Sequence, residues 1–347
     1  MKRRIAVVFG SILLLAPACA GLNVAVSAAD AVPGDGPRFA LPLSCEPHKT
    51  CFIQSYVDHD AGPASSDYAC GTATYDGHKG TDFRVLSAAA AANGVAVLAS
   101  ADGVIKGVRD GMDDDLIPDD QHARVANREC GNGAVVDHGG GWETQYCHMK
   151  KGSVAVSKGQ AVKRGDRLGY VGYSGLAEFA HVHFEVRKDG KVLDPFTGLE
   201  QTSACQLNGD AAQTSLWSPD VLRAFPKPET EILGAFFSSA KPTSQQLEAD
   251  HAAKVPGPGA PELYFVGRIA NIRKGDTVRV TLLGPGGFKY ANTSEPLPKN
   301  RGLHLAYGIA RTGKGGALPA GQYAGNIELL RDGTVIAAQS GELTISR

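Results

Sequence analysis

Two histidines separated by one residue form the part of the sequence with the clearest chemical potential. His181 and His183 lie in the stretch His-Val-His-Phe-Glu-Val-Arg, whose valines and phenylalanine predict a short β-strand. Side chains alternate between the two faces of a strand, so both imidazoles should project from the same face. They can then share one small site, either as two metal ligands or as one ligand and one acid–base group. A pair of surface histidines without a function would show the same pattern.

Two clusters upstream supply the other groups that a hydrolytic metal site needs. Such a site uses three protein ligands, an open position for water, a general acid or base, and a donor for the oxyanion. His78 and Asp82 lie four residues apart, in what should be a loop that enters a strand. They could supply two ligands, and one histidine of the pair could supply the third. The other histidine of the pair, together with His148, would remain for proton transfer or oxyanion stabilisation.

His148 ends a second predicted strand, which begins at Gln145. Regular alternation would place Tyr146 and His148 on one face, toward the site, and Cys147 on the other. Cys147 is therefore expected to form a structural disulfide rather than to bind metal.

The three clusters resemble the motifs of the lysostaphin/LytM-type zinc metallopeptidases, which cleave peptide cross-links of bacterial cell walls. The motifs are His-x-x-x-Asp at 78–82, Tyr-x-His at 146–148 and His-x-His at 181–183, in the order found in that family. Residues 97–104, 158–166 and 169–175 resemble the segments between them. The likeness covers roughly residues 70–197, about a third of the chain.

The resemblance implies a function for each residue of the three clusters. His78, Asp82 and His183 would hold Zn²⁺, while His148 and His181 would be catalytic. It also implies a mostly antiparallel β fold with the site in an open groove. The substrate would be the peptide part of peptidoglycan, meaning its stem peptides and cross-links.

Length and composition are consistent with a β protein of two domains. The chain has 347 residues, 43 of them glycine, and only 7% are aromatic, which suits a turn-rich β protein better than a helical bundle. The formal net charge of -1 gives no reason to expect a nucleic-acid partner. The sequence does not indicate an oligomeric state.

Residues 1–29 are predicted to be a secretory signal peptide. Three basic residues at 2–4 precede an apolar stretch at 5–16 that is too short to span a bilayer, and small residues at 26–28 offer a cleavage site. The mature protein should therefore be exported to a periplasm or the medium, with no stable membrane insertion after cleavage. Lipidation of Cys19 is an open alternative.

Six cysteines remain after the signal peptide, an even number that predicts a disulfide framework in an exported protein. Cys45 and Cys51 could close a short loop, and Cys130 and Cys147 could meet across a hairpin, which would leave Cys70 and Cys205 to pair. Other pairings stay open, because spacing alone does not fix the connectivity.

The rest of the chain predicts a mainly β architecture. Residues 30–201 should form a disulfide-containing zinc metallopeptidase domain built on an antiparallel sheet, residues 202–258 a linker, and residues 259–347 a small β-sandwich of unknown role. Hairpins are expected at 95–108 and 134–148. The acidic stretch 110–120 lacks the spacing of an EF-hand and is expected to be a solvated loop that could overhang a groove. His48 and His59 are expected to be ordinary surface histidines.

The sequence thus predicts an exported zinc metalloendopeptidase that cleaves peptidoglycan cross-links with metal-activated water. A non-catalytic protein of the same fold that binds or regulates a cell-wall enzyme is one alternative. A secreted protease that acts on ordinary proteins is another.

Overall fold

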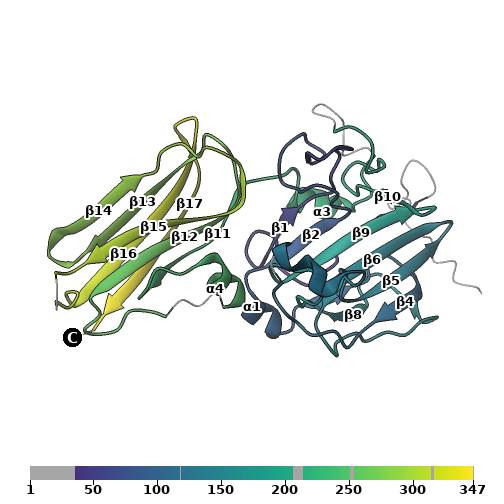
Figure 1. The fold of residues 1–347 in the computed structure, drawn as a ribbon, viewed down its shortest axis with the longest axis horizontal. Helices are drawn as coiled ribbons and strands as arrows, with labels where there is room; N and C mark the ends of the chain where they lie inside the picture. Colours follow the sequence, from purple (N-terminus) through teal and green to yellow (C-terminus); the bar gives the residue numbers. More distant parts are fainter. Residues whose placement is uncertain (1–35, 118, 206–213, 251–253, 314–315, 347) are drawn as a thin grey trace, which may run out of the picture.

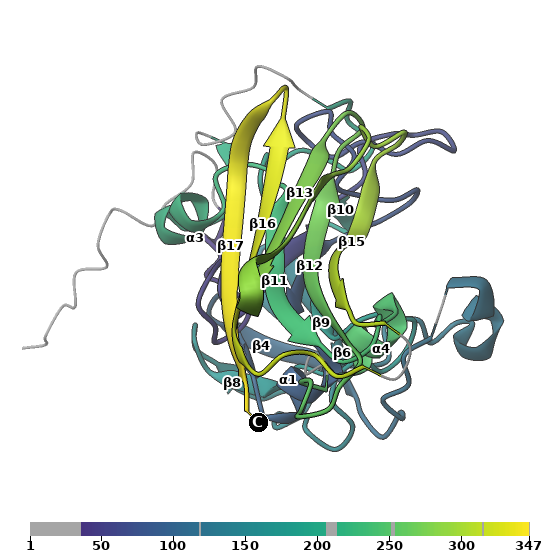
Figure 2. The same ribbon diagram turned by 90° about the vertical axis from the view of Figure 1, so that its left-hand side faces the viewer.

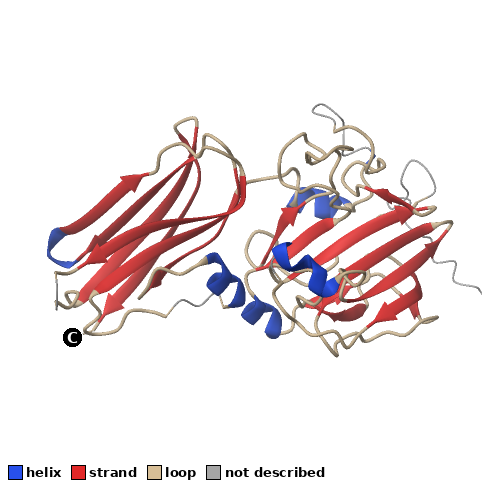
Figure 3. Ribbon diagram, viewed as in Figure 1, coloured by secondary structure: helices blue, strands red, loops and turns tan. Residues whose placement is uncertain are grey.

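Strands dominate the structure, a computed structural model, and form two groups that lie side by side (Figures 1 and 3). The structure describes residues 36–117, 119–205, 214–250, 254–313 and 316–346. The predicted signal peptide and Cys19 lie outside the described residues. Within these ranges, no helix is long and apolar enough to cross a bilayer.

The first group is an antiparallel sheet of eight strands with a two-stranded ribbon packed on its buried face. The order across the sheet is β1 (Cys51–Ser55), β2 (Thr81–Val85), β9 (His181–Lys188), β6 (Trp142–Met149), β5 (Asn132–Gly139), β4 (Gly103–Arg109) and β7 (Ala161–Val162), with β10 (Lys191–Leu193) paired to β9. The ribbon consists of β3 (Ala96–Leu98) and β8 (Arg167–Tyr170). The short helix α1 (Ala88–Ala92) and the 3₁₀ segment η2 (Asp119–Val125) lie in loops.

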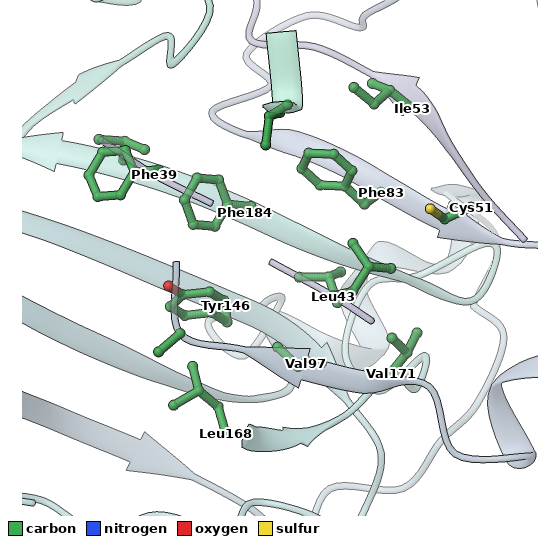
Figure 4. Packing of buried hydrophobic residues seen from close by; sticks show 14 of the residues in the cluster. Phe39, Leu43, Cys51, Ile53, Phe83, Val97, Tyr146, Leu168, Val171 and Phe184 are labelled. Carbon is green, nitrogen blue, oxygen red and sulfur yellow. The ribbon is translucent and has the colours of Figure 1, made fainter. Parts of the chain in front are cut away.

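Strand β9 shows why the sheet has one buried face. Val182, Phe184 and Val186 are fully buried and point into the core, so the alternate residues from His181 onward point to the opposite face. Figure 4 shows Phe184 close to other buried aromatic residues of this core, among them Phe39. Truncation of Phe184 to alanine should cost about 3–5 kcal/mol. Core packing on one face therefore fixes the direction of both site histidines on the other.

One of the two predicted hairpins is confirmed and the other is wrong. β5 and β6 pair antiparallel across the glycine turn 139–141, where all three residues have positive φ. β3 and β4 do not pair with each other, because β3 leaves the main sheet to pair with β8. The intervening backbone has other partners: Ala99 N–H donates to Asp166 O, and Ser100 N–H donates to the buried Tyr146 hydroxyl.

The second group consists of two antiparallel sheets that enclose one core, as a β-sandwich does. One sheet has the order β11 (Glu231–Ser238), β12 (Glu262–Ile272), β15 (Arg301–Arg311); the other has β14 (Phe288–Thr293), β13 (Thr277–Gly284), β16 (Gly321–Arg331), β17 (Thr334–Ile345). Both sheets contribute to the core, for example through Phe265 of β12 and Ile327 of β16, which are fully buried. Figure 2 views the molecule from the side of this group. The 3₁₀ turn η3 (Pro285–Gly287) precedes β14.

Residues 202–258, predicted as a linker, contribute to both groups. Trp217 and Phe225, on either side of helix α3 (Pro219–Ala224), are buried in the first core. β11 is a full strand of the second group, and helix α4 (Ser244–Ala249) follows it and lies near α1 between the groups (Figure 1). The domain boundaries predicted from the sequence, 30–201, 202–258 and 259–347, are not tested by these contacts and stay predictions.

The three disulfides join the cysteines in the pairs that the sequence favoured. They are Cys45–Cys51, Cys70–Cys205 and Cys130–Cys147. All six cysteines precede residue 206, so the second group contains no disulfide.

Candidate metal centre

The three predicted metal ligands converge on the face of the large sheet that lies opposite the first hydrophobic core, and they are largely buried there. Asp82 of β2 pairs directly with His183 of β9, and paired residues of antiparallel strands project from the same face. His78 comes from the loop that enters β2. Its Nε2 lies 3.1 Å from Asp82 Oδ1 and 3.1 Å from His183 Nδ1, and His183 Nδ1 lies 2.9 Å from Asp82 Oδ1.

This spacing fits a metal ion bound by two imidazoles and one carboxylate. Four ligands in a tetrahedron with bonds of about 2.0–2.1 Å lie about 3.3 Å from one another. The three donor atoms here are separated by nearly that distance. The donor set therefore fits a divalent cation such as zinc.

The other two predicted site residues lie beside this cluster. His181 Nε2 is 3.6 Å from Asp82 Oδ1, and the rings of His148 and His181 are 4.5 Å apart between their centres. All five site residues predicted from the sequence thus occur in one cluster.

A β-bulge gives His148 its position. Asn132 pairs with Met149 and Ala134 with Tyr146, so β6 spans three steps where β5 spans two. His148 lies in this bulge with φ of 61°, a left-handed conformation that non-glycine residues rarely adopt. The extra residue reverses the alternation at the end of β6 and brings His148 to the face that carries His183.

The prediction about Tyr146 and Cys147 is therefore wrong in its geometry. Tyr146 pairs with Phe184 and is fully buried in the core, so it points away from the metal centre. Cys147 pairs with His183 and shares its face. Its disulfide with Cys130 was predicted correctly, but this disulfide lies on the face of the site rather than behind it.

Main-chain carbonyls orient three of the imidazoles. Nδ1 of His78 donates to Tyr56 O (2.6 Å), Nδ1 of His148 donates to Ser174 O (2.7 Å), and Nδ1 of His181 donates to Phe179 O (2.8 Å). Since a carbonyl can only accept, each proton is held on Nδ1, and Nε2 is left with its lone pair toward the site. The arrangement presents one nitrogen suited to a metal and two suited to accept a proton.

The pKa shifts in the cluster favour the charged form of Asp82 and His183 but the neutral form of His148 and His181. Burial by itself would raise the pKa of Asp82, but the surrounding histidines hold it well below its usual range. Burial would lower the pKa of His183, yet hydrogen bonds to Asp82 and Glu185 raise it to about 9. Burial lowers the pKa of His181, and burial together with the neighbouring histidines holds the pKa of His148 well below its usual value. These last two imidazoles are neutral at neutral pH and can accept protons.

Sequence reasoning missed Glu185, the next residue on the site face of β9. Its Oε2 lies 3.8 Å from His183 Nε2, and its Oε1 accepts a hydrogen bond from Arg187. The Glu185 carboxylate thus lies on the Nε2 side of the His183 ring, whose Nδ1 faces Asp82. A carboxylate in this position can fix the orientation of a metal-binding histidine. The alternation that placed His181 and His183 on one face also places Glu185 there and could have identified it.

Other predictions concern residues outside this cluster. His48 is exposed, as expected, but His59 is buried and lies 2.8 Å from Asp194 Oδ2, so its surface assignment is wrong. In the acidic loop, Asp110 and Asp114 accept hydrogen bonds from the backbone N–H groups of residues 151, 152, 154 and 173. The loop is partly exposed and is fastened to its neighbours by these bonds.

A cluster of three possible metal ligands with two imidazoles beside it is typical of metal-dependent hydrolases, and a family model matches this part of the chain. Residues 76–195 match the model of peptidase family M23. This part of the chain is therefore similar to the M23 metallopeptidases, a family that implies a bound metal.

Several curated relatives share this region. An uncharacterised metalloprotease of Haemophilus influenzae is 31% identical over 122 residues, which are 35% of this chain and 20% of that protein. The peptidoglycan DD-endopeptidase ShyA of Vibrio cholerae is 32% identical over 117 residues, 34% of this chain and 22% of that protein. The chain thus spans about a fifth of the length of these relatives.

Among solved structures, the catalytic domain of lysostaphin from Staphylococcus simulans aligns with a TM-score of 0.27 and 20% identity. The alignment covers 41% of this chain and 85% of that domain. A zinc-containing peptidase from Vibrio cholerae aligns with a TM-score of 0.31 and 24% identity, covering 48% and 40% of the two chains.

Proposed function

We propose that the protein is an exported zinc metalloendopeptidase that hydrolyses peptide cross-links of bacterial peptidoglycan. The observation that carries the proposal is the convergence of His78, Asp82 and His183 beside the neutral imidazoles of His148 and His181. The relatives named as peptidoglycan DD-endopeptidases support the choice of substrate. The three disulfides support an oxidising compartment, as expected after export.

Each residue of the centre has a distinct task in this proposal. His78, Asp82 and His183 hold Zn²⁺, which when bound polarises the scissile carbonyl and lowers the pKa of water. Glu185 keeps the His183 ring turned with Nδ1 toward Asp82.

Proton transfer belongs to His148 and His181. Their Nδ1 atoms are tied to main-chain carbonyls, so Nε2 of one imidazole can take the proton from the attacking water. The same atom can return that proton to the leaving amine. While this imidazole holds that proton, its Nε2–H can donate a hydrogen bond to the oxygen that gains charge as water adds to the carbonyl, and the other imidazole offers a second proton acceptor beside it.

A digest of purified, cross-linked peptidoglycan with residues 30–347, with and without chelator, tests the proposal. Mass spectrometry should show chelator-sensitive conversion of cross-linked dimers to monomers and should identify the bond that is cut. Absence of conversion by protein that binds no zinc would contradict the proposal and favour a non-catalytic cell-wall protein. Hydrolysis of an ordinary protein at rates comparable to those of wall peptides would favour a general secreted protease.

A further inference from the structure

A cavity of about 620 Å³ lies between the two groups of strands, beside the metal centre. One wall comes from the first group: the end of β1, the loop at residues 72–75 and the loop at 178–179. The other wall comes from the second group: helix α4 and the start of β15. Leu116 of the acidic loop also lines it, so this loop does reach a groove, as the sequence suggested. The volume is in the range of ligand-binding pockets.

The cavity continues directly from the metal centre. Two of its aromatic residues also contact site histidines: the Tyr75 ring lies 4.4 Å from the His78 ring, and the Phe179 ring lies 4.5 Å from the His181 ring. Its floor is the same face of the large sheet, because Ser55 pairs with Asp82. A chain bound at the metal centre can therefore extend into the cavity without leaving the sheet.

Buried contacts fix the two walls relative to each other. Glu248 of α4 accepts a hydrogen bond from Arg84 of β2 (2.6 Å to Oε2) and forms an ion pair with Arg268 of β12. The two arginine side chains are buried, with exposed fractions of 1% and 0%. Phe52 of β1 packs against Leu233 of β11 in a small apolar cluster on the same boundary. The second group is thus held in place over the cavity.

The lining suits the main chain of a peptide. The side chains of Ser55, Thr72, Ser244 and Gln245 face the cavity and make no hydrogen bond within the described part of the chain. Ser55 is only 7% exposed, so its hydroxyl has the cavity as its route to a partner. Hydroxyl and amide groups bind peptide N–H and C=O groups without selecting for charge. The charged groups Arg84 and Glu248 are already paired with each other.

We propose that this cavity is a binding subsite for the peptide chain of the substrate beyond the scissile bond, and that the C-terminal sandwich contributes one of its walls. The inference rests on the proposed function, since it takes the chain held at the metal centre to be a peptide. A peptide is favoured over a glycan strand because the cavity opens from the position of the scissile bond. The C-terminal group, for which the sequence indicated no role, then takes part in substrate selection.

Substitutions that fill the cavity from either wall test the subsite. Gln245→Trp on α4 and Thr72→Trp in the opposite loop place an indole in the cavity, and both positions are exposed, so the fold should tolerate them. Gln339→Trp, at an exposed position of β17 that does not line the cavity, is the matched control. The probes are a synthetic, sugar-free cross-linked dimer of stem peptides and the shortest peptide that the wild-type protein cleaves.

Both cavity variants should lower kcat/KM for the cross-linked dimer by about tenfold or more, which corresponds to 1.4 kcal/mol. They should leave the shortest peptide within about twofold and zinc content unchanged, and the control should change neither substrate. Equal loss on both peptides, or no loss on either, would overturn the subsite. A loss seen only with glycan-bearing substrate would overturn its assignment to the peptide.

Direct binding separates this inference from the proposed function. If the wild-type protein cleaves neither peptide, binding of the dimer is measured by calorimetry. Weaker binding to Gln245→Trp than to Gln339→Trp would support the subsite although the proposed hydrolysis had failed. Equal binding to both, or no binding to either, would overturn the subsite as well.

Discussion

The buried contact among Arg84, Glu248 and Arg268 yields the most quantitative prediction. Burial, with the charge of Arg268 nearby, lowers the pKa of Arg84 to about 10 even though Glu248 opposes the shift, so Arg84 remains charged at pH 7. Glu248→Gln keeps the size of the side chain but removes the charge that both arginines share. Two buried cations would then face each other without an anion.

The size of the effect follows from the burial of all three groups. Their side chains are 1%, 9% and 0% exposed, so solvent screens them little. Removal of one partner from a buried ion pair costs about 3–5 kcal/mol, and here two cations lose their shared partner. With a urea dependence near 3 kcal/mol per molar, the unfolding midpoint should fall by at least about 1 M.

Urea unfolding of the oxidised protein measures this effect. The two tryptophans, Trp142 and Trp217, both belong to the first group of strands, so their fluorescence follows that group, while far-UV circular dichroism follows the whole chain. Glu200→Gln is the matched control, because Glu200 pairs with Lys191 on the surface, where solvent screens the charges, so its loss should change the midpoint little. A Glu248→Gln midpoint no lower than that of the control would refute the reasoning.

Three further predictions concern the site, the disulfides and one buried histidine. Asp82→Ala should abolish metal binding and hydrolysis together, whereas His148→Ala should abolish hydrolysis and retain zinc; equal zinc loss in both, measured by atomic emission, would contradict the division of roles. Reduction should lower the melting temperature of the first group and spare the second, since Cys70–Cys205 alone spans 135 residues and is worth about 5 kcal/mol; equal shifts in calorimetry would count against this. Burial lowers the pKa of His59, but the hydrogen bond and charge of Asp194 outweigh burial, and the net pKa is raised. The His59–Asp194 pair therefore stabilises the folded state fully below about pH 6.5, the pKa of an unfolded histidine. This stabilisation is lost as the pH rises through the folded-state pKa of His59. The difference in unfolding free energy between wild type and His59→Asn should therefore shrink from pH 6 to pH 9, and a difference independent of pH would contradict it.

Local periodicity predicted much of the metal centre. Alternation along β9 placed His181 and His183 on one face, and the i, i+4 spacing brought His78 close to Asp82. These relations depend on residues near one another in the chain, where strand geometry alone decides.

The errors arose where geometry depends on partners far away in sequence. The bulge at His148 reversed the alternation of β6, and a histidine at positive φ carries no sequence signal of the kind that glycine gives. His59 looked like a surface residue because its partner, Asp194, lies 135 positions away. The cavity between the two groups of strands could not be predicted from the sequence either, because its shape depends on how the two groups pack against each other.

The anchoring of the three imidazoles to carbonyl oxygens bears on how the sequence around the centre can diverge. Tyr56, Ser174 and Phe179 hold these rings through their main chains, and every amino acid has a carbonyl group. Exchange of those side chains need not turn the rings, provided that the backbone keeps its path. Substitutions at these three positions can thus change the side chains around the site, and with them the substrate preference, while the histidine rings keep their orientation.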